Sequence, residues 1–316
     1  MEMKAFDCFS GGGGFRILTE PQGIKFVGWC ENNKYAQMLY RAYYNTDGEY
    51  FCNDATKINT NDLPDFDIFF GGFPCQAFSI AGKRQGFKDI RGALFFEIAR
   101  ICQDKKPKYI ILENVKGLLD HDDGRTFSTI IGVLSDIGYS IEWQVLYSKY
   151  FEVPQDRKRI YIVGYLGKES RSKILPIQES NYVYNEAEQE EVSQIACCIK
   201  AGDNTNLNGN FIVEKIGNVN PSGRGQNGNI FDAEGLCPTL TTNKGEGIKI
   251  YDGYRFRRLT PLECARLQGF PDDILHKAYE IGISDNQLYK IFGNAVTATI
   301  PREIIKLITE KEEYTA

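Results

Sequence analysis

The first half of the chain alternates between short apolar runs and segments whose apolar residues recur at helical spacing. The apolar runs predict strands at residues 4–9, 25–31, 67–71, 108–113, 139–146 and 159–164. Helical spacing predicts helices at residues 15–18, 34–44, 92–103 and 127–137. This alternation is typical of an α/β fold with a doubly wound, mostly parallel sheet, which binds ligands at the carboxyl ends of its strands.

The pattern changes after Gly167. Residues 199–250 are rich in Gly and Asn and show few helical periods, and helical patterns return only at residues 261–268 and 297–308. We therefore predict two domains. Residues 1–165 plus 285–316 form the α/β domain, and residues 166–284 form a smaller, irregular domain of loops and strands.

Charge changes this picture little. The net charge of −5 argues weakly against a nucleic-acid partner, because phosphate contacts need positive charge. Basic residues are nevertheless concentrated at residues 157–159, 168–173 and 255–258, so a local basic face is compatible with the acidic total.

Cysteine usage and hydropathy indicate a cytoplasmic protein without a membrane span. No apolar run approaches the roughly 20 residues that a spanning helix needs, and the N-terminus does not have the pattern of a signal peptide. The nine cysteines form no C-x-x-C pair, and only two histidines are present. We expect reduced thiols and no metal site.

Residues 11–14 form a glycine cluster between a predicted strand and a predicted helix, where a ligand can approach the main chain. Arg16 stands where a dinucleotide fingerprint requires its third glycine. Glu31 ends the next strand and is suited to accept hydrogen bonds from ribose hydroxyls, and Asp54 follows a third strand-like segment. These features favour a nucleoside-type cofactor; the alternative is a tight turn beside a solvated carboxylate.

Three further groups stand at predicted strand ends. Cys75 follows Pro74 and is a candidate nucleophile, although a lone cysteine is also an ordinary buried thiol. Glu113 ends a very apolar strand, so burial is expected to raise its pKa and make it a proton donor, unless it only caps a helix. Arg157 and Arg159 supply cations beside a further strand. A thiol, an acid and guanidinium groups together favour catalysis.

The motifs in their order along the chain resemble those of bacterial and phage cytosine-5 DNA methyltransferases. They span residues 6–296: FDCFSGGGGF (6–15), WCEN (29–32), NDA (53–55), GGFPCQAFS (71–79), RGALFFEIAR (91–100), ENV (113–115), QDRKR (155–159), RRLTPLECARLQGFP (257–271) and FGNAV (292–296).

This resemblance implies methyl transfer from S-adenosylmethionine, without a metal, to carbon 5 of a flipped-out cytosine. Cys75 would attack carbon 6, Glu113 would steady the ring, and Arg157 and Arg159 would hold the base and its phosphate. The cofactor residues implied are Phe9, Gly11, Gly12, Gly14, Glu31, Asn32, Asp54, Ala55, Pro74, Leu94, Asn294 and Val296. The chain departs from the family pattern at Gly12, Asn32 and Ala55, which makes weaker cofactor binding an expectation.

The resemblance also implies a monomer that binds double-stranded DNA, with a cognate restriction endonuclease as a candidate partner. Residues 76–92 would form a mobile flap that reaches DNA through Gln76, Ser79, Lys83 and Arg84. The smaller domain would read the sequence, with Arg224, Gln226, Asn229, Thr239 and Lys244 as candidate contacts; solvated surface loops are the alternative.

Three other functions remain open. A transfer-RNA methyltransferase would share the catalytic motifs, a nicotinamide oxidoreductase would share the glycine cluster, and a non-catalytic relative would bind DNA without modifying it.

Overall fold

The structure is a computed structural model that describes residues 2–74, 94–167, 174–177, 215–218, 229–232, 236–240, 248–251 and 256–315. Eight of the candidate residues lie outside the described residues: Cys75, Gln76, Ser79, Lys83, Arg84, Arg224, Gln226 and Lys244.

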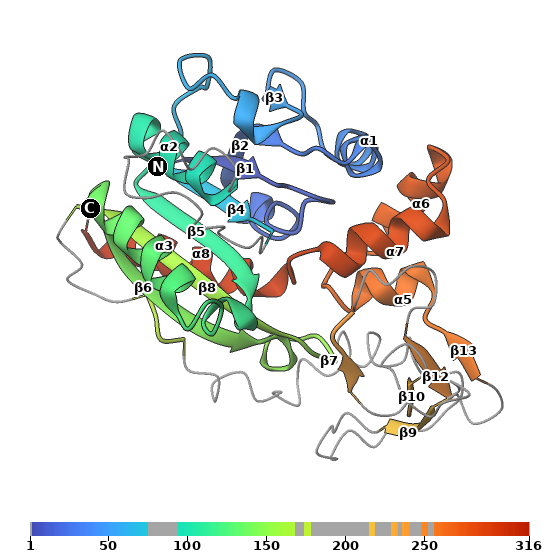
Figure 1. Cartoon of the computed structure of the whole chain (residues 1–316). Helices are drawn as coiled ribbons and strands as arrows, with labels where there is room; N and C mark the ends of the chain where they lie inside the picture. Colours follow the sequence, from blue (N-terminus) through green and yellow to red (C-terminus); the bar gives the residue numbers. More distant parts are fainter. Residues whose placement is uncertain are drawn as a thin grey trace.

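A seven-stranded sheet forms the centre of the larger part of the molecule (Figure 1). Its strands are β1 (Met3–Cys8), β2 (Ile24–Cys30), β3 (Tyr50–Cys52), β4 (Ile68–Gly72), β5 (Tyr109–Val115), β6 (Tyr139–Tyr147) and β8 (Lys158–Leu166). Their order is β3-β2-β1-β4-β5-β8-β6, and within this sheet β8 alone runs in the direction opposite to the other six strands. The predicted α/β class with a mostly parallel sheet is therefore confirmed.

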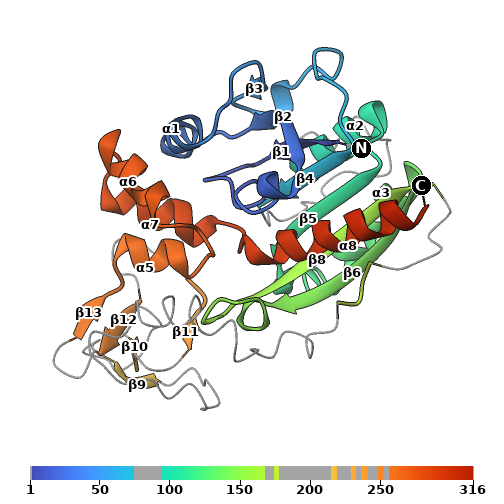
Figure 2. The same ribbon diagram turned by 180° about the vertical axis from the view of Figure 1, so that it is seen from behind.

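Helices cover both faces of this sheet. Helices α2 (Leu94–Lys105) and α3 (Arg125–Asp136) lie on the face seen in Figure 1, and the long helix α8 (Thr299–Thr315) crosses the opposite face in Figure 2. The alternating side chains of each strand fill two separate cores. Phe6, Phe69 and Leu112 point toward α2 and α3, while Phe70 and Ile111 point toward α8.

A third hydrophobic cluster joins the two ends of the chain. It packs α1 (Lys34–Tyr43) against α5 (Pro261–Arg266), α6 (Asp273–Glu280) and α7 (Asp285–Asn294). Leu39 and Phe292 are completely buried there, and the Tyr43 hydroxyl donates a hydrogen bond of 2.8 Å to Asp273. The helices that precede and follow residue 284 thus share one core.

The smaller part of the molecule is rich in strands, as predicted. Strands β9 (Lys215–Asn218), β10 (Asn229–Asp232), β12 (Lys249–Tyr251) and β13 (Phe256–Arg258) form a sheet in the order β13-β12-β10-β9. The short strands β7 (Gln155–Asp156) and β11 (Cys237–Pro238) pair in parallel and connect this part to the larger sheet.

Short 3-10 helices occupy several connections: η1 (Glu20–Gln22), η2 (Ala55–Lys57), η3 (Lys116–Leu118) and η4 (Ser148–Tyr150). The prediction of a helix at residues 15–18 was wrong, because this segment forms turns. Gly11 and Gly13 adopt positive φ values of 55° and 90°, and Pro21 follows closely, so a regular helix cannot extend through this region. Helices α6 and α7 were not predicted.

Among the helices that the structure describes, none has the length and apolar character required to span a membrane.

Candidate active site

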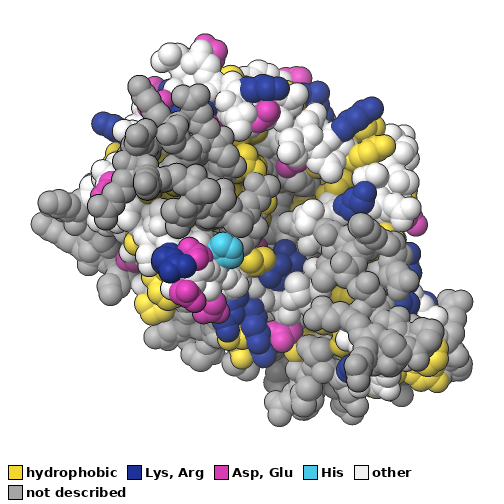
Figure 3. All heavy atoms as spheres, viewed as in Figure 1, with side chains coloured by type: hydrophobic (Ala, Val, Ile, Leu, Met, Phe, Trp, Pro, Cys, Tyr) yellow, Lys and Arg dark blue, Asp and Glu magenta, His cyan; other side chains and the backbone are white. Residues whose placement is uncertain are grey.

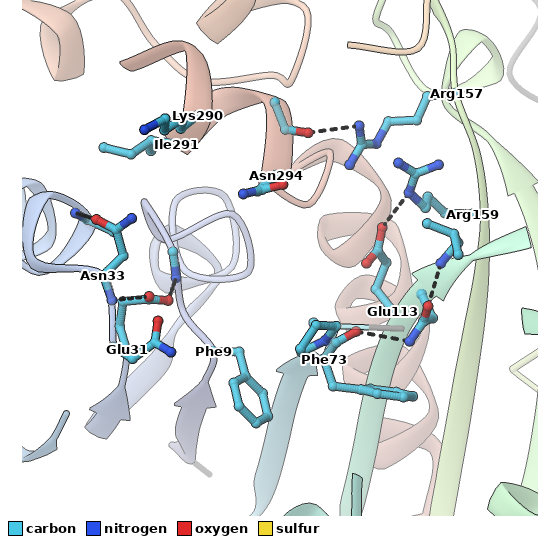
Figure 4. Close-up of a pocket in the computed structure, with 18 residues that line it drawn as sticks. Phe9, Glu31, Asn33, Phe73, Glu113, Arg157, Arg159, Lys290, Ile291 and Asn294 are labelled. Carbon is cyan, nitrogen blue, oxygen red and sulfur yellow. Dashed lines mark hydrogen bonds and ion pairs between the residues drawn. The ribbon is translucent and has the colours of Figure 1, made fainter. Parts of the chain in front are cut away.

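A cavity of about 420 Å³ opens at the carboxyl ends of the parallel strands, between the large sheet and α7 (Figure 4). Nine of the predicted site residues line it: Phe9, Gly11, Glu31, Asn32, Pro74, Glu113, Arg157, Arg159 and Asn294. The location agrees with the rule that ligands of such sheets bind at the carboxyl ends of the strands. Residues that were predicted to belong to one site, although up to 285 positions apart in the sequence, thus line the same cavity.

The first side of the cavity is built around the Glu31 carboxylate. One of its oxygens accepts a hydrogen bond of 2.8 Å from the Gly11 N–H, and the other accepts one of 2.7 Å from the Asn33 N–H. The Asn33 side chain in turn caps α1 by accepting from the N–H groups of Tyr35 and Ala36. Glu31 is therefore held in place between the glycine cluster and the start of α1. Each carboxylate oxygen keeps a second lone pair for a ligand hydroxyl.

Phe9 lines this side of the cavity, whereas Gly14 does not. Phe9 has a φ of 58°, a rare conformation for a residue other than glycine, and its side chain lies between Glu31 and Phe73 in Figure 4. Gly14 lies behind the cavity against Val296, where an added Cβ would lie 2.7 Å from the Val296 carbonyl oxygen. A larger residue at position 14 would push the C-terminal segment away from the glycine cluster.

Six of the predicted cofactor residues do not line the cavity: Gly12, Gly14, Asp54, Ala55, Leu94 and Val296. Asp54 caps η2, accepting hydrogen bonds from the N–H and hydroxyl groups of Thr56, and these bonds lower the pKa of its carboxyl group. Ala55 is buried in the core, and Leu94 begins α2.

The second side of the cavity carries the predicted acid. The carboxylate of Glu113 forms an ion pair of 3.0 Å with Nε of Arg159, and both side chains are largely buried. Burial raises the pKa of Glu113 above its ordinary value, although the charges of Arg159 and Arg157 act in the opposite direction. A carboxyl group with a raised pKa retains a proton more readily, which supports its predicted use as an acid.

Arg157 has a different environment from Arg159. It is buried, and its two terminal nitrogens donate hydrogen bonds to the carbonyl oxygens of Gly293, at 3.3 Å, and Ala295, at 2.9 Å. Burial and the neighbouring charge of Arg159 lower its pKa to about 10, so it remains charged at neutral pH. Arg157 therefore fixes the end of α7, including Asn294, against the strand that carries Arg159.

Several cavity residues were not predicted as site residues: Asn33, Ala36, Gly72, Phe73, Asn114, Val115, Lys290, Ile291 and Gly293. Asn114 and Val115 belong to the quoted motif ENV, and Gly293 belongs to FGNAV. Treating every residue of these motifs as a candidate would have included all three. Lys290 and Ile291 lie on α7, which the apolar pattern had not revealed.

The exit of β4 is fixed next to Glu113. Gly72 lies opposite Glu113 in the parallel ladder between β4 and β5. The Asn114 side chain, one residue further along, donates a hydrogen bond of 2.9 Å to the Phe73 carbonyl, as Figure 4 shows. The chain therefore reaches Pro74, a cavity residue, on the same wall as Glu113.

The two described DNA-contact candidates already have partners in the protein. The Thr239 hydroxyl donates a hydrogen bond of 3.0 Å to the Asp156 carbonyl. The Asn229 side chain accepts one of 2.8 Å from the Asn218 side chain within the small sheet. Their predicted contact with DNA stays a prediction.

Buried Gln155 connects the two parts of the molecule. Its amide nitrogen donates to the Leu267 carbonyl at 2.7 Å, and its amide oxygen accepts from the Leu240 N–H at 3.1 Å. These bonds, together with the pairing of β7 and β11, hold the smaller part beside the strand of Arg157 and Arg159.

Asp7 is a buried carboxyl group beneath the glycine cluster. The Tyr40 hydroxyl donates a hydrogen bond of 3.2 Å to it, and burial raises its pKa to about 8, outweighing the opposite influences of Arg16 and Tyr40. Because the folded pKa lies above the unfolded one, the unfolding free energy should fall as pH rises from about 4 to about 8. Asp7→Asn, which mimics the protonated acid, should flatten this dependence. Thermal unfolding between these pH values measures it.

The exposed residue Asp47 provides the control, since Asp47→Asn should leave the pH dependence of the wild type unchanged. Parallel stability curves for the wild type and Asp7→Asn would contradict a neutral Asp7 in the folded protein.

Within the described ranges, no group of three or more His, Cys, Asp and Glu side chains is arranged to hold a metal ion.

Comparison with known proteins defines the class of enzyme. The family model of C-5 cytosine-specific DNA methylases matches residues 3–310, so the chain belongs to this family of DNA methyltransferases. It is 35% identical to the type II methyltransferase M.HhaI of Haemophilus parahaemolyticus, over 94% of the chain and 91% of that relative. It is 38% identical to the type II methyltransferase M.NlaX of Neisseria lactamica, over 95% and 94% of the two chains.

An orphan methyltransferase of Bacillus phage SPR, M.SPRI, is 31% identical over 96% of the chain and 97% of that relative. The relatives therefore include both type II and orphan enzymes. Among solved structures, the Dnmt2 methyltransferase of S. pombe has the same fold, with a TM-score of 0.72, 19% identity and coverage of 98% and 99%.

Proposed function

We propose that the chain transfers a methyl group from S-adenosylmethionine to carbon 5 of a flipped-out cytosine in a short specific sequence of double-stranded DNA. The observation that carries the proposal is the adjacency of Gly72 and Glu113 in the sheet. The main chain leaves β4 beside the predicted acid, three residues before Cys75, which supports the proposal that one cavity serves both a nucleophile and an acid.

The methyl donor fits the first side of the cavity. Glu31 offers carboxylate lone pairs to ribose hydroxyls, Phe9 offers an aromatic ring, and Ile291 adds an apolar surface. When bound, S-adenosylmethionine supplies an electrophilic methyl group. The remaining chemistry is that of the protein side chains and the base.

The cytosine would enter the second side of the cavity after leaving the duplex, which costs roughly a few kcal/mol. As the Cys75 thiolate bonds to carbon 6, the π bond between carbons 5 and 6 breaks and its electron pair is delocalised over carbon 5 and ring nitrogen 3, where Glu113 stabilises it by hydrogen bonding to nitrogen 3. Arg159 orients Glu113 and the base. The methyl transfer to carbon 5 leaves S-adenosylhomocysteine. A base then removes the proton from carbon 5, the electron pair of that C–H bond re-forms the 5,6 double bond, and Cys75 leaves carbon 6 as a thiolate.

The arrangement of Arg157 supports an indirect contribution to this reaction. Its guanidinium binds the carbonyl oxygens next to Asn294, so it positions the cofactor side relative to the acid side. We also propose that residues 166–284 act as the target-recognition domain, which Gln155 and β11 hold next to the cavity.

Incubating the protein with DNA and S-adenosylmethionine, followed by methylation-sensitive sequencing, tests the function directly. We expect 5-methylcytosine at one short recurring sequence. A parallel reaction with transfer RNA distinguishes the RNA alternative. The absence of 5-methylcytosine from the DNA would overturn the proposal.

A further inference from the structure

Two lysines lie at the same edge of the sheet as the cavity but on its outer side. Lys149 lies in η4, directly after the carboxyl end of β6, and Lys158 begins β8. Arg159, the next residue, lies opposite Val115 of the cavity wall, whereas Lys158 lies opposite Tyr147. Because successive strand residues point to opposite faces, Lys158 projects away from the face on which Arg157 and Arg159 lie.

Aromatic rings support both ammonium groups. The Lys158 Nζ lies 4.9 Å from the centre of the Tyr147 ring, and the Lys149 Nζ lies 5.0 Å from the Tyr150 ring and 5.9 Å from the Tyr147 ring. The two rings are 6.0 Å apart. We call Tyr147, Lys149, Tyr150 and Lys158 the lysine–tyrosine surface. Such stacking restricts the flexible lysine stems, so less freedom is lost when an anion binds.

The charge of this surface is not neutralised within the described part of the chain. Lys57, Lys105, Lys108 and Lys277 each form an ion pair with a carboxylate, whereas no such pair involves Lys149 or Lys158 there. In the space-filling view, Lys and Arg side chains lie near the middle of this face, with Asp and Glu side chains beside them (Figure 3). A protein with a net charge of −5 needs such local positive charge to approach a polyanion.

We propose that the lysine–tyrosine surface binds the phosphate backbone of DNA beside the flipped-out cytosine. The inference rests on the proposed function, since a base that reaches Glu113 brings its own backbone to the adjacent edge of the sheet. Lysine contributes a point charge to a phosphate and reads no base, so this surface contributes affinity without sequence preference.

The test compares DNA binding by wild type and Lys149→Gln/Lys158→Gln, measured by fluorescence anisotropy with a DNA duplex across a series of salt concentrations. Two lost phosphate contacts should reduce the slope of log affinity against log salt by about 1.8, since each contact contributes about 0.9. The ratio of the DNA affinity of the wild type to that of Lys149→Gln/Lys158→Gln should therefore fall about 12-fold between roughly 50 and 200 mM salt.

A matched control removes the same charge at the opposite end of the sheet. Lys4 and Lys25 lie opposite each other near the starts of β1 and β2, and both are exposed. Lys4→Gln/Lys25→Gln should keep the wild-type slope. Lys149→Arg/Lys158→Arg, which retains the charges, should restore most of it.

The methyl-transfer rate at saturating DNA distinguishes the two proposals. If the wild type binds DNA but forms no 5-methylcytosine, the proposed function fails, while the slopes still test the surface. An unchanged slope and affinity in Lys149→Gln/Lys158→Gln would overturn the surface proposal even if the enzyme is fully active. An equal loss of slope in the control pair would also overturn it, because net charge alone would then explain the effect.

Discussion

Replacing Cys75 by serine should abolish methyl transfer, lowering turnover on the order of 10⁴-fold or more, without changing the affinity for S-adenosylmethionine. A serine hydroxyl stays protonated at neutral pH, whereas a thiol ionises readily and is intrinsically more nucleophilic. The proposed cofactor side of the cavity is built around Glu31 and Phe9, which the substitution leaves unchanged.

Turnover is measured by transfer of radiolabelled methyl groups, and cofactor affinity by calorimetry. Cys102→Ala is the matched control, because this thiol is buried in α2 away from the cavity and its loss should leave turnover near that of the wild type. Retained methylation by Cys75→Ser would exclude this residue as the nucleophile.

Replacing Glu113 by glutamine should lower turnover by roughly 10²–10⁴-fold, the usual contribution of a positioned acid or base. Glutamine keeps the shape of the side chain but cannot provide a proton, and it leaves Arg159 without its carboxylate partner. The wild type should also lose activity as pH rises through the pKa of Glu113, because the protonated form is then depleted. The glutamine variant should lack this pH dependence.

The pH profile of turnover for both proteins, at saturating DNA and cofactor, measures the effect. The matched control is Glu263→Gln, since Glu263 is also buried and paired with an arginine, Arg257, but lies outside the cavity. It should lose some stability but keep the pH profile of the wild type. An identical profile in the wild type and Glu113→Gln would argue against the acid role.

The strand pattern predicted the sheet and the positions of its strongest site residues. Glu31 directly follows β2 and Glu113 lies two residues before the end of β5. Because parallel strands bring their carboxyl ends together, local sequence sufficed to place both carboxylates in one cavity. The glycine cluster lies beside the cavity as predicted, but the helix predicted to follow it is absent, because residues 15–18 form turns. The positive φ values of Gly11 and Gly13 cannot be read from periodicity.

Features that depend on contacts across the whole chain could not be predicted. Helix α7 contains Asp285, Asn286 and Gly293, whose types favour a loop, and its helical form is stabilised by packing of Leu288 and Phe292 in the third cluster. Arg157 and Arg159 were predicted to hold the base and its phosphate, which stays a prediction; the structure shows in addition that Arg157 binds carbonyl groups more than 130 residues away. A charged residue in a motif does not reveal its partner.

Composition also did not show which polar residues of the smaller part contact DNA and which stabilise its fold. Asn and Thr are suited to base edges, yet Asn229 and Thr239 show that the same polar groups also stabilise the local fold. The sequence alone cannot distinguish these uses, because both need only a donor or an acceptor.

The cavity wall formed by Lys290, Ile291 and Asn294 has a consequence for the order of events during synthesis. The glycine cluster emerges from the ribosome well before this wall, and Arg157 can secure the wall only after Ala295 has been made. A nascent chain therefore carries half of the proposed donor site until the segment around Asn294 has been translated. Because such distant contacts form slowly, methylation competence should lag behind completion of the polypeptide.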